Sequence, residues 1–174
     1  MSQSSLVRAV EDVLFEGRAL LGMIDAEEYR WKDMKGCGAS IGMHYRHVLE
    51  HFQCLLGGMA NGLVDYDQRR RSSELETSLD ASILATDDLI GRFRMLTVEA
   101  LERECGVRYS VGGGDDQPEE ARSTWAREVM FCVGHATHHY ALMKPLCAQL
   151  GVPVRFEFGL APSTLKHLQV QEVR

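Results

Sequence analysis

The longest helical pattern in the chain is TWAREVMFCVGHATHHYALMKPLCAQL, residues 124–150. Its apolar side chains recur every three or four residues, the spacing that places them on one face of a helix. The pattern begins at Thr124, and Gly151 followed by Pro153 ends it. We therefore expect one long amphipathic helix here, with its apolar face covered by other helices.

Three earlier segments have the same periodicity. They cover residues 6–24, 40–59 and 79–104. Residues 63–78 are charged and lack this periodicity, which predicts a long crossover in place of a tight turn. Four amphipathic helices with one long crossover are typical of a four-helix bundle, and the strand patterns are too few for a sheet fold. The chain is predicted to be all-α, a four-helix bundle forming one domain over residues 1–174.

A small β-hairpin is expected before the last long helix. VRYSV, residues 107–111, alternates apolar and polar side chains and precedes the turn sequence GGGDDQP, residues 112–118. Residues 25–39 are expected to be a connector. After the last long helix, the tail is expected to dock as a loop with a short final helix, and FGLAPST, residues 158–164, has no assigned chemical role.

Composition excludes several classes of function. A formal net charge of −6 over 174 residues disfavours a nucleic-acid-binding surface, which needs clustered Lys and Arg. No segment has the long apolar run of a membrane span, and the start of the chain lacks the apolar block of a signal peptide. The five cysteines include no CxxC pair, which favours a reducing compartment. We expect a cytoplasmic protein that binds neither nucleic acid nor membrane.

Six of the seven histidines lie in two short clusters. The first cluster, in SIGMHYRHVLEHF, and the second, in VGHATHHYALM, contain His44, His47, His51, His135, His138 and His139. On a helical wheel the first three form one stripe bordering an apolar face, whereas His135 and His139 fall inside one and His138 lies near its edge. A buried imidazole has lost water, so two on one buried face are costly unless a shared partner satisfies both.

A divalent metal ion is such a partner. One pair of histidines from the last helix and one histidine from the second would give three ligands, with positions left open for water or substrate. Imidazole suits zinc, nickel, copper and iron, and we expect zinc or nickel, with iron or manganese as alternatives. The competing interpretation has no metal, because a lone histidine on an apolar face is more often a hydrogen-bonded core residue.

The first cluster resembles the second-helix signature of the DinB-like superfamily of damage-inducible, metal-binding proteins. In that signature Ser or Thr and then Gly precede the ligand histidine by seven and five positions, and Ser40, Gly42 and His47 stand at these offsets. The second cluster is similar to the family's HxxxHxGQ motif, which places two further ligands on His135 and His139.

The resemblance implies an up-down-down-up bundle, often dimeric, with a three-histidine site for nickel, zinc or a similar divalent cation. The ligands it implies are His47, His135 and His139, and we keep His51 and His44 as additional candidates. It also implies a small-molecule substrate and a homodimer.

The chain departs from the family after the last ligand. Tyr140, Ala141 and Leu142 stand where the family has Arg-Gly-Gln, so the family's substrate contacts do not transfer. Similarity to the thiol-transferase and maleylpyruvate-isomerase branch implies an enzyme that transfers a low-molecular-weight thiol to an electrophile. Metal-dependent hydrolysis is an alternative, and so is a non-enzymatic stress-response bundle whose metal only ties two helices together. No catalytic residue can be identified from the sequence.

Other polar residues have simpler interpretations. Glu50 is expected to form a salt bridge, and Glu128 to pair at the surface, although it could also reach the surroundings of the metal. Tyr45 and Tyr140 are expected to pack in the core.

The charged crossover contains Arg69, Arg70 and Arg71 in succession. These arginines could bind an anionic substrate near the mouth of the site. A solvated charge run paired with local acids is the simpler interpretation.

Overall fold

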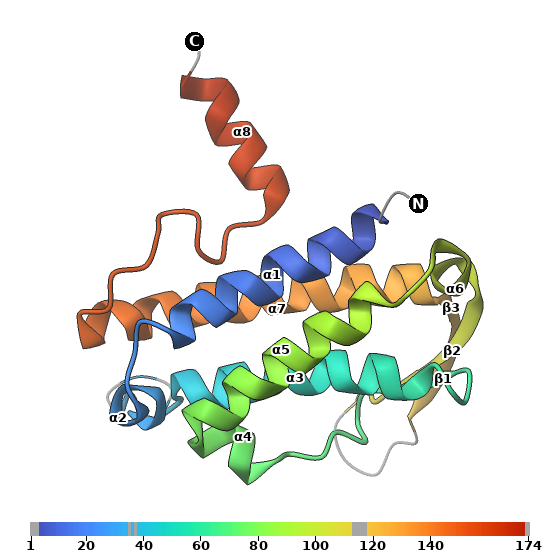
Figure 1. Cartoon of the computed structure of the whole chain (residues 1–174), viewed down its shortest axis with the longest axis horizontal. Coiled ribbons are helices and arrows are strands. Elements are labelled where there is room, and N and C mark those ends of the chain that lie inside the picture. The colour runs from blue at the N-terminus through green and yellow to red at the C-terminus, as the bar shows by residue number, and fades with distance from the viewer. Residues whose placement is uncertain (1–3, 35, 37, 113–117, 173–174) are drawn as a thin grey trace.

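Four long helices form the body of the protein (Figure 1). The computed structural model describes residues 4–34, 36, 38–112 and 118–172. The long helices are α1 (Ser5–Leu21), α3 (Ile41–Gly58), α5 (Leu79–Arg94) and α7 (Trp125–Leu150). In Figure 1, α1 and α7 run in one direction and α3 and α5 in the other, which is the expected up-down-down-up order. Because α3 and α5 are parallel, the chain must return between them, and the long crossover does so.

Each long helix begins after a hydroxyl side chain. Ser4, Ser40, Ser78 and Thr124 each accept a hydrogen bond from a backbone N–H group in the first turn that follows. Such caps satisfy amide groups that have no partner within the helix. At the other end of α7, Gly151 has φ 73°, a left-handed conformation that glycine adopts without strain. The expected starts of these helices and the expected end of α7 are therefore confirmed.

The core lies where the four helices meet. Both α1 and α3 pack against both α5 and α7, so the helices form a ring around one apolar interior. Side chains buried there include Val10, Leu14, Tyr45, Val48, Phe52, Leu89, Phe93, Trp125, Val129 and Met143, all at most 1% exposed. Burial of such side chains contributes about 1.5–3 kcal/mol each, which makes it the main stabilising interaction.

A three-stranded sheet closes one end of the bundle. Its strands are β1 (Leu63–Asp65), β2 (Glu104–Tyr109) and β3 (Glu119–Thr124), in the order β1-β2-β3. Strands β2 and β3 are antiparallel and form the expected hairpin, whereas β1 pairs with β2 in parallel. Sequence analysis did not anticipate β1, because three residues inside a charged segment give no strand pattern. Residues 113–117 of the expected turn lie outside the described residues.

The expected helix over residues 79–104 is too long. Helix α5 ends at Arg94, and the Thr97 hydroxyl accepts a hydrogen bond from the Ala100 N–H at the start of the short helix α6 (Val98–Glu102). Glu104 then pairs with Thr124 in the sheet. A new cap and strand pairing thus override an apolar periodicity that continues past the end of α5.

The connecting segments contain two more short helices. Helix α2 (Ala26–Arg30) begins with a capping box between Asp25 and Glu28, inside the stretch expected to be a connector. Helix α4 (Ser73–Thr77) lies within the crossover. Both pack against α3 and thereby cover its first turns.

The tail forms a loop and a final helix, α8 (Pro162–Glu172), as expected, but α8 extends away from the bundle in Figure 1, so the expectation that this helix docks is wrong. Before it, Phe158 is buried, and Gly159 has φ 73°. A Cβ atom at Gly159 would lie 2.3 Å from the backbone nitrogen of Ala141, so glycine allows the tail to contact α7. In the part of the chain that the structure describes, we find no helix with the length and apolar character needed to cross a membrane.

Candidate metal centre

Helices α3 and α7 pack side by side and bring the two histidine clusters together. Five imidazole rings from the two helices are in contact. They form a group, the histidine cluster, made of His44, His47, His51, His135 and His139. Neighbouring ring centroids within it are between 4.2 Å (His51 and His135) and 5.2 Å (His44 and His139) apart.

Three of these rings bring one nitrogen atom each close together. One ring nitrogen from each of His47, His135 and His139 lies within 4.8 Å of the others. The Nε2 atoms of His47 and His135 are 2.9 Å apart. Around a metal with metal–nitrogen distances of about 2.0–2.1 Å, right-angle to tetrahedral geometry separates neighbouring ligand nitrogens by about 2.8–3.4 Å. This pair therefore already has the spacing of two ligands, with a proton where a metal ion would be.

The three rings are neutral at physiological pH. Burial, with smaller contributions from the other histidines, lowers the pKa of His47 to about 2 and that of His139 to about 3. Burial is also the main reason why the pKa of His135 falls to about 4. A neutral imidazole has a lone pair to offer a metal, so protons compete weakly for these nitrogens. Three imidazoles without a carboxylate suit zinc, nickel and related ions and do not suit magnesium or calcium.

The two additional candidates lie beside this group of three. The His51 Nδ1–H donates a hydrogen bond to the carbonyl oxygen of His47, with 2.8 Å between nitrogen and oxygen, which fixes the orientation of its ring. The Nδ1 atoms of His44 and His139 are 3.0 Å apart, so one ring donates to the other. Hydrogen bonds of this kind orient metal-binding histidines in other proteins. His138 is exposed, and its ring contacts the cluster at His139, with 5.5 Å between centroids.

The helical wheel misplaced the histidines relative to the core. His47, His135 and His139 are half-buried at the edge of the α3–α7 interface, whereas His51, expected at the border, is only 2% exposed. The prediction that His135 and His139 lie inside the apolar face is therefore wrong. The buried face of α7 instead contains Trp125, Glu128, Val129, Cys132, Ala136, Tyr140 and Met143.

A second layer of residues lies beneath the cluster; Tyr66 was not expected there, and Glu128 was expected there only as an alternative. The ring of Tyr66, directly after β1, stacks on His51 with 5.3 Å between centroids. The Tyr66 hydroxyl donates to Glu128, with 2.9 Å between oxygens, and this carboxylate also accepts from Ser123 and Arg127. Glu128 is 0% exposed, so the expectation that it pairs at the surface is wrong. Its position one turn after Trp125, on the buried face of α7, is the signal that could have found it.

The remaining polar residues behave as expected. The hydroxyl of Tyr45 hydrogen-bonds to Thr86, and that of Tyr140 donates to the carbonyl oxygen of Val13, both in the core. The Glu50 carboxylate pairs with Arg46 and accepts from the Ser72 N–H in the crossover. These residues support the positions of α3 and α7 and do not join the histidine cluster.

Comparison with known proteins gave one relative by sequence. No family model matches the chain. A stretch of 109 residues is 42% identical to FK506-binding protein 5 of Rhizopus delemar. The match covers 63% of this chain and 28% of that protein, so it extends over less than a third of the relative's length.

Two solved structures are similar in fold to this chain over most of its length. A DinB-like protein of Bacillus subtilis, YjoA, matches with a TM-score of 0.66 and 18% identity, over 89% of this chain and 99% of the other. YfiT of Bacillus subtilis, described as a probable metal-dependent hydrolase with an unusual four-helix bundle topology, matches with a TM-score of 0.58 and 16% identity, over 87% and 92%. The chain therefore has the DinB-like four-helix-bundle fold.

Proposed function

We propose that the protein is a metal-dependent enzyme acting on a small molecule, with a divalent transition-metal ion held by His47, His135 and His139. The observation that carries this proposal is the convergence of three neutral imidazoles from two helices, with their ligand atoms within 4.8 Å of one another. The description of YfiT, which shares the fold, as a probable metal-dependent hydrolase supports it. The donor set favours zinc or nickel.

The half-buried position of the group of three favours an open site over a closed structural one. Three protein ligands leave at least one position for another molecule, which is the composition of reactive sites. A bound ion of this class lowers the pKa of a water or thiol that reaches it and so supplies a nucleophile near neutral pH. The buried, stacked rings of His51 and Tyr66 keep water away from one side of the three proposed ligands.

Thiol transfer to an electrophile is the reaction we propose first. In the described part of the chain no carboxylate lies with the three histidines as a further possible ligand. The nearby Glu128 carboxylate already accepts three hydrogen bonds. Hydrolysis by an activated water generally uses a base to accept its second proton, whereas a thiol has a single proton to lose. The sulfur would form a bond to the electrophilic carbon, the bond from that carbon to the leaving group would break with its electron pair going to the leaving group, and the thiol proton would pass to solvent or to the departing group.

Hydrolysis of a small ester or amide is the second candidate, favoured by the description of YfiT. It differs from thiol transfer in its requirement for a co-substrate. A hydrolase consumes its substrate without added thiol, whereas a transferase needs the thiol and forms a thioether product.

The test uses full-length protein purified without a histidine tag. Metal content is measured by mass spectrometry, followed by turnover of 1-chloro-2,4-dinitrobenzene with glutathione or cysteine and of p-nitrophenyl acetate without thiol. We expect bound metal and metal-dependent consumption of the chlorobenzene with thiol. His135→Ala should lose both metal and turnover, whereas His138→Ala, a change on the same helix outside the group of three, should keep both.

Other outcomes have distinct meanings. Ester turnover without thiol would replace the transferase by the hydrolase. Full metal content with no turnover of any substrate class would favour the non-enzymatic bundle, and a chain that takes up no metal would overturn the proposal. The homodimer and the single domain over residues 1–174 stay predictions that sedimentation and limited proteolysis can check.

A further inference from the structure

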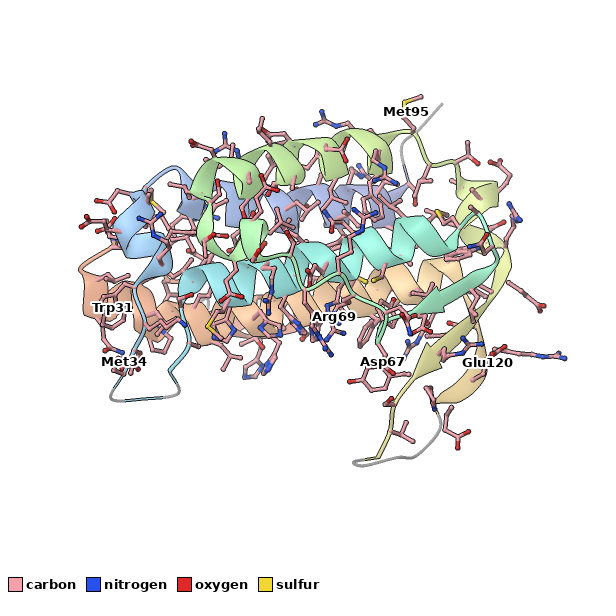
Figure 2. The ribbon with its side chains drawn as sticks, turned by 90° about the horizontal axis from the view of Figure 1, so that it is seen from below. Trp31, Met34, Asp67, Arg69, Met95 and Glu120 are labelled. Atoms are coloured by element: carbon pink, nitrogen blue, oxygen red, sulfur yellow. The ribbon has the colours of Figure 1, made fainter. Side chains whose placement is uncertain are left out.

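Arg69 is held beside the histidine cluster by the crossover. It follows Tyr66 by three residues, and its guanidinium Nη1 donates a hydrogen bond to the carbonyl oxygen of Tyr66. In Figure 2, Arg69 lies on the face of the bundle formed by α3 and α7, whereas Asp67 lies farther toward the sheet. The side chain is half-buried, so it is not a freely solvated surface arginine.

Tyr66 connects this guanidinium to the proposed metal centre. The Tyr66 ring stacks on His51, whose ring centroid is 4.2 Å from that of His135. Tyr66 thus contacts Arg69 through its backbone carbonyl oxygen and the histidine cluster through its ring.

The acids nearest to Arg69 in sequence are engaged elsewhere. Asp65 accepts hydrogen bonds from two backbone N–H groups of the following turn and pairs with Arg108 at 3.5 Å. Asp67 accepts from both the backbone nitrogen and the hydroxyl of Ser110, each at 2.7 Å. Among the described residues, no carboxylate forms an ion pair with Arg69. The expected pairing with local acids thus does not hold for Arg69.

A half-buried guanidinium beside neutral rings has uncompensated charge. An anionic group on a ligand would compensate it through charge-assisted hydrogen bonds, which are stronger than neutral ones. Because Nη1 already donates to the chain, the remaining N–H groups suit one small planar anion. Arg70 lines a separate pocket with Glu50 and Asp65, and Arg71 is exposed, so the three arginines do not form one polyanion-binding patch.

We propose that Arg69 binds a carboxylate group of the substrate at the metal centre, so that the protein acts on small carboxylate-bearing molecules. This inference rests on the proposed function, because it places the carboxylate beside a metal held by the three histidines. It adds the class of substrate, which neither the fold nor the histidines define.

The test measures anion binding to Co²⁺-loaded full-length protein. Visible absorption is recorded during titration with acetate and, as a neutral ligand of the same shape, acetamide. We expect acetate to change the spectrum far more strongly than acetamide. Arg69→Gln should weaken acetate binding by about tenfold or more. Arg69→Lys should retain part of the acetate affinity, because lysine keeps the positive charge but lacks the planar guanidinium group. The matched control Arg70→Gln should bind acetate like the unmodified protein.

Metal content of every variant is measured in parallel, which separates this inference from the function on which it rests. Full metal content with unchanged acetate affinity in Arg69→Gln overturns the carboxylate proposal alone. Equal binding of acetate and acetamide to the unmodified protein also overturns it. A chain that takes up no Co²⁺ overturns both proposals.

Discussion

Replacing His135 with alanine should remove most of the thermal stabilisation that a metal ion gives the protein. In the proposed site the ion joins one ligand on α3 to two on α7, an arrangement that exists only when these helices are packed together. A ligand that binds only the folded state stabilises it by about 2.7 kcal/mol at a concentration one hundred times its Kd. For a domain of this size, that corresponds to an increase in Tm of about 5–11 °C.

The structure indicates why His135 should matter so much. Its Nε2 atom is already 2.9 Å from Nε2 of His47, so the ion can replace a proton with little movement of either ring. Changing residues that merely orient metal ligands costs about 10–100-fold in affinity, and loss of a ligand should cost at least the upper value. At the same metal concentration a hundredfold loss leaves about 0.4 kcal/mol of stabilisation. The increase in Tm then falls to about 1–2 °C.

Differential scanning calorimetry of protein first stripped with a chelator, then scanned with and without Zn²⁺ or Ni²⁺, measures this difference. Each variant serves as its own metal-free reference, so any direct effect of the substitution on folding cancels. His138→Ala, on the same helix but exposed, should keep the full increase. A full increase in Tm for His135→Ala, or its loss in His138→Ala, would refute the ligand assignment.

Three other predictions concern the structure around the site. Glu128→Ala should lower the free energy of unfolding by about 3 kcal/mol in urea titrations, because it leaves the buried Tyr66 hydroxyl without its carboxylate acceptor. Glu128→Gln should lower it less, since the amide oxygen can still accept that hydrogen bond. Equal losses in the two variants would contradict this explanation. Gly42→Ala should destabilise by about 1–3 kcal/mol or more, because its Cβ would lie 2.2 Å from a crossover carbonyl oxygen. The control Gly91→Ala, with open space inside α5, should stabilise by about 1 kcal/mol, and a loss there as large as at Gly42 would exclude the steric explanation. In metal-free protein, the lowered pKa of His47 keeps it neutral when folded, while the unfolded chain takes up a proton below about 6.5. The free energy of unfolding should therefore fall as pH decreases from 7 toward 4, and a rise over that range in urea titrations would contradict the pKa assignment.

The sequence alone predicted the features that depend on neighbouring residues. The serines at the start of the first helix, Ser40 and Gly151 marked helix ends, because such residues act on backbone groups within one turn. The spacing of His135 and His139 placed both on one face of a helix for the same reason. The charged residues 63–78, which lack helical periodicity, correctly predicted a long crossover in place of a tight turn.

Tertiary structure alone decided how these local features combine. The rotation of α7 about its own axis depends on its whole buried face, including the polar Glu128. This rotation places His135 and His139 at the edge of the core and not inside it. His47 and His135 are 88 residues apart, and the packing of α3 on α7 brings their nitrogens within 2.9 Å. Tyr66 and Arg69 reach the cluster only because β1 pairs with a strand about forty residues later in the chain. No local pattern encodes such contacts, since they depend on how the complete set of buried surfaces fits together.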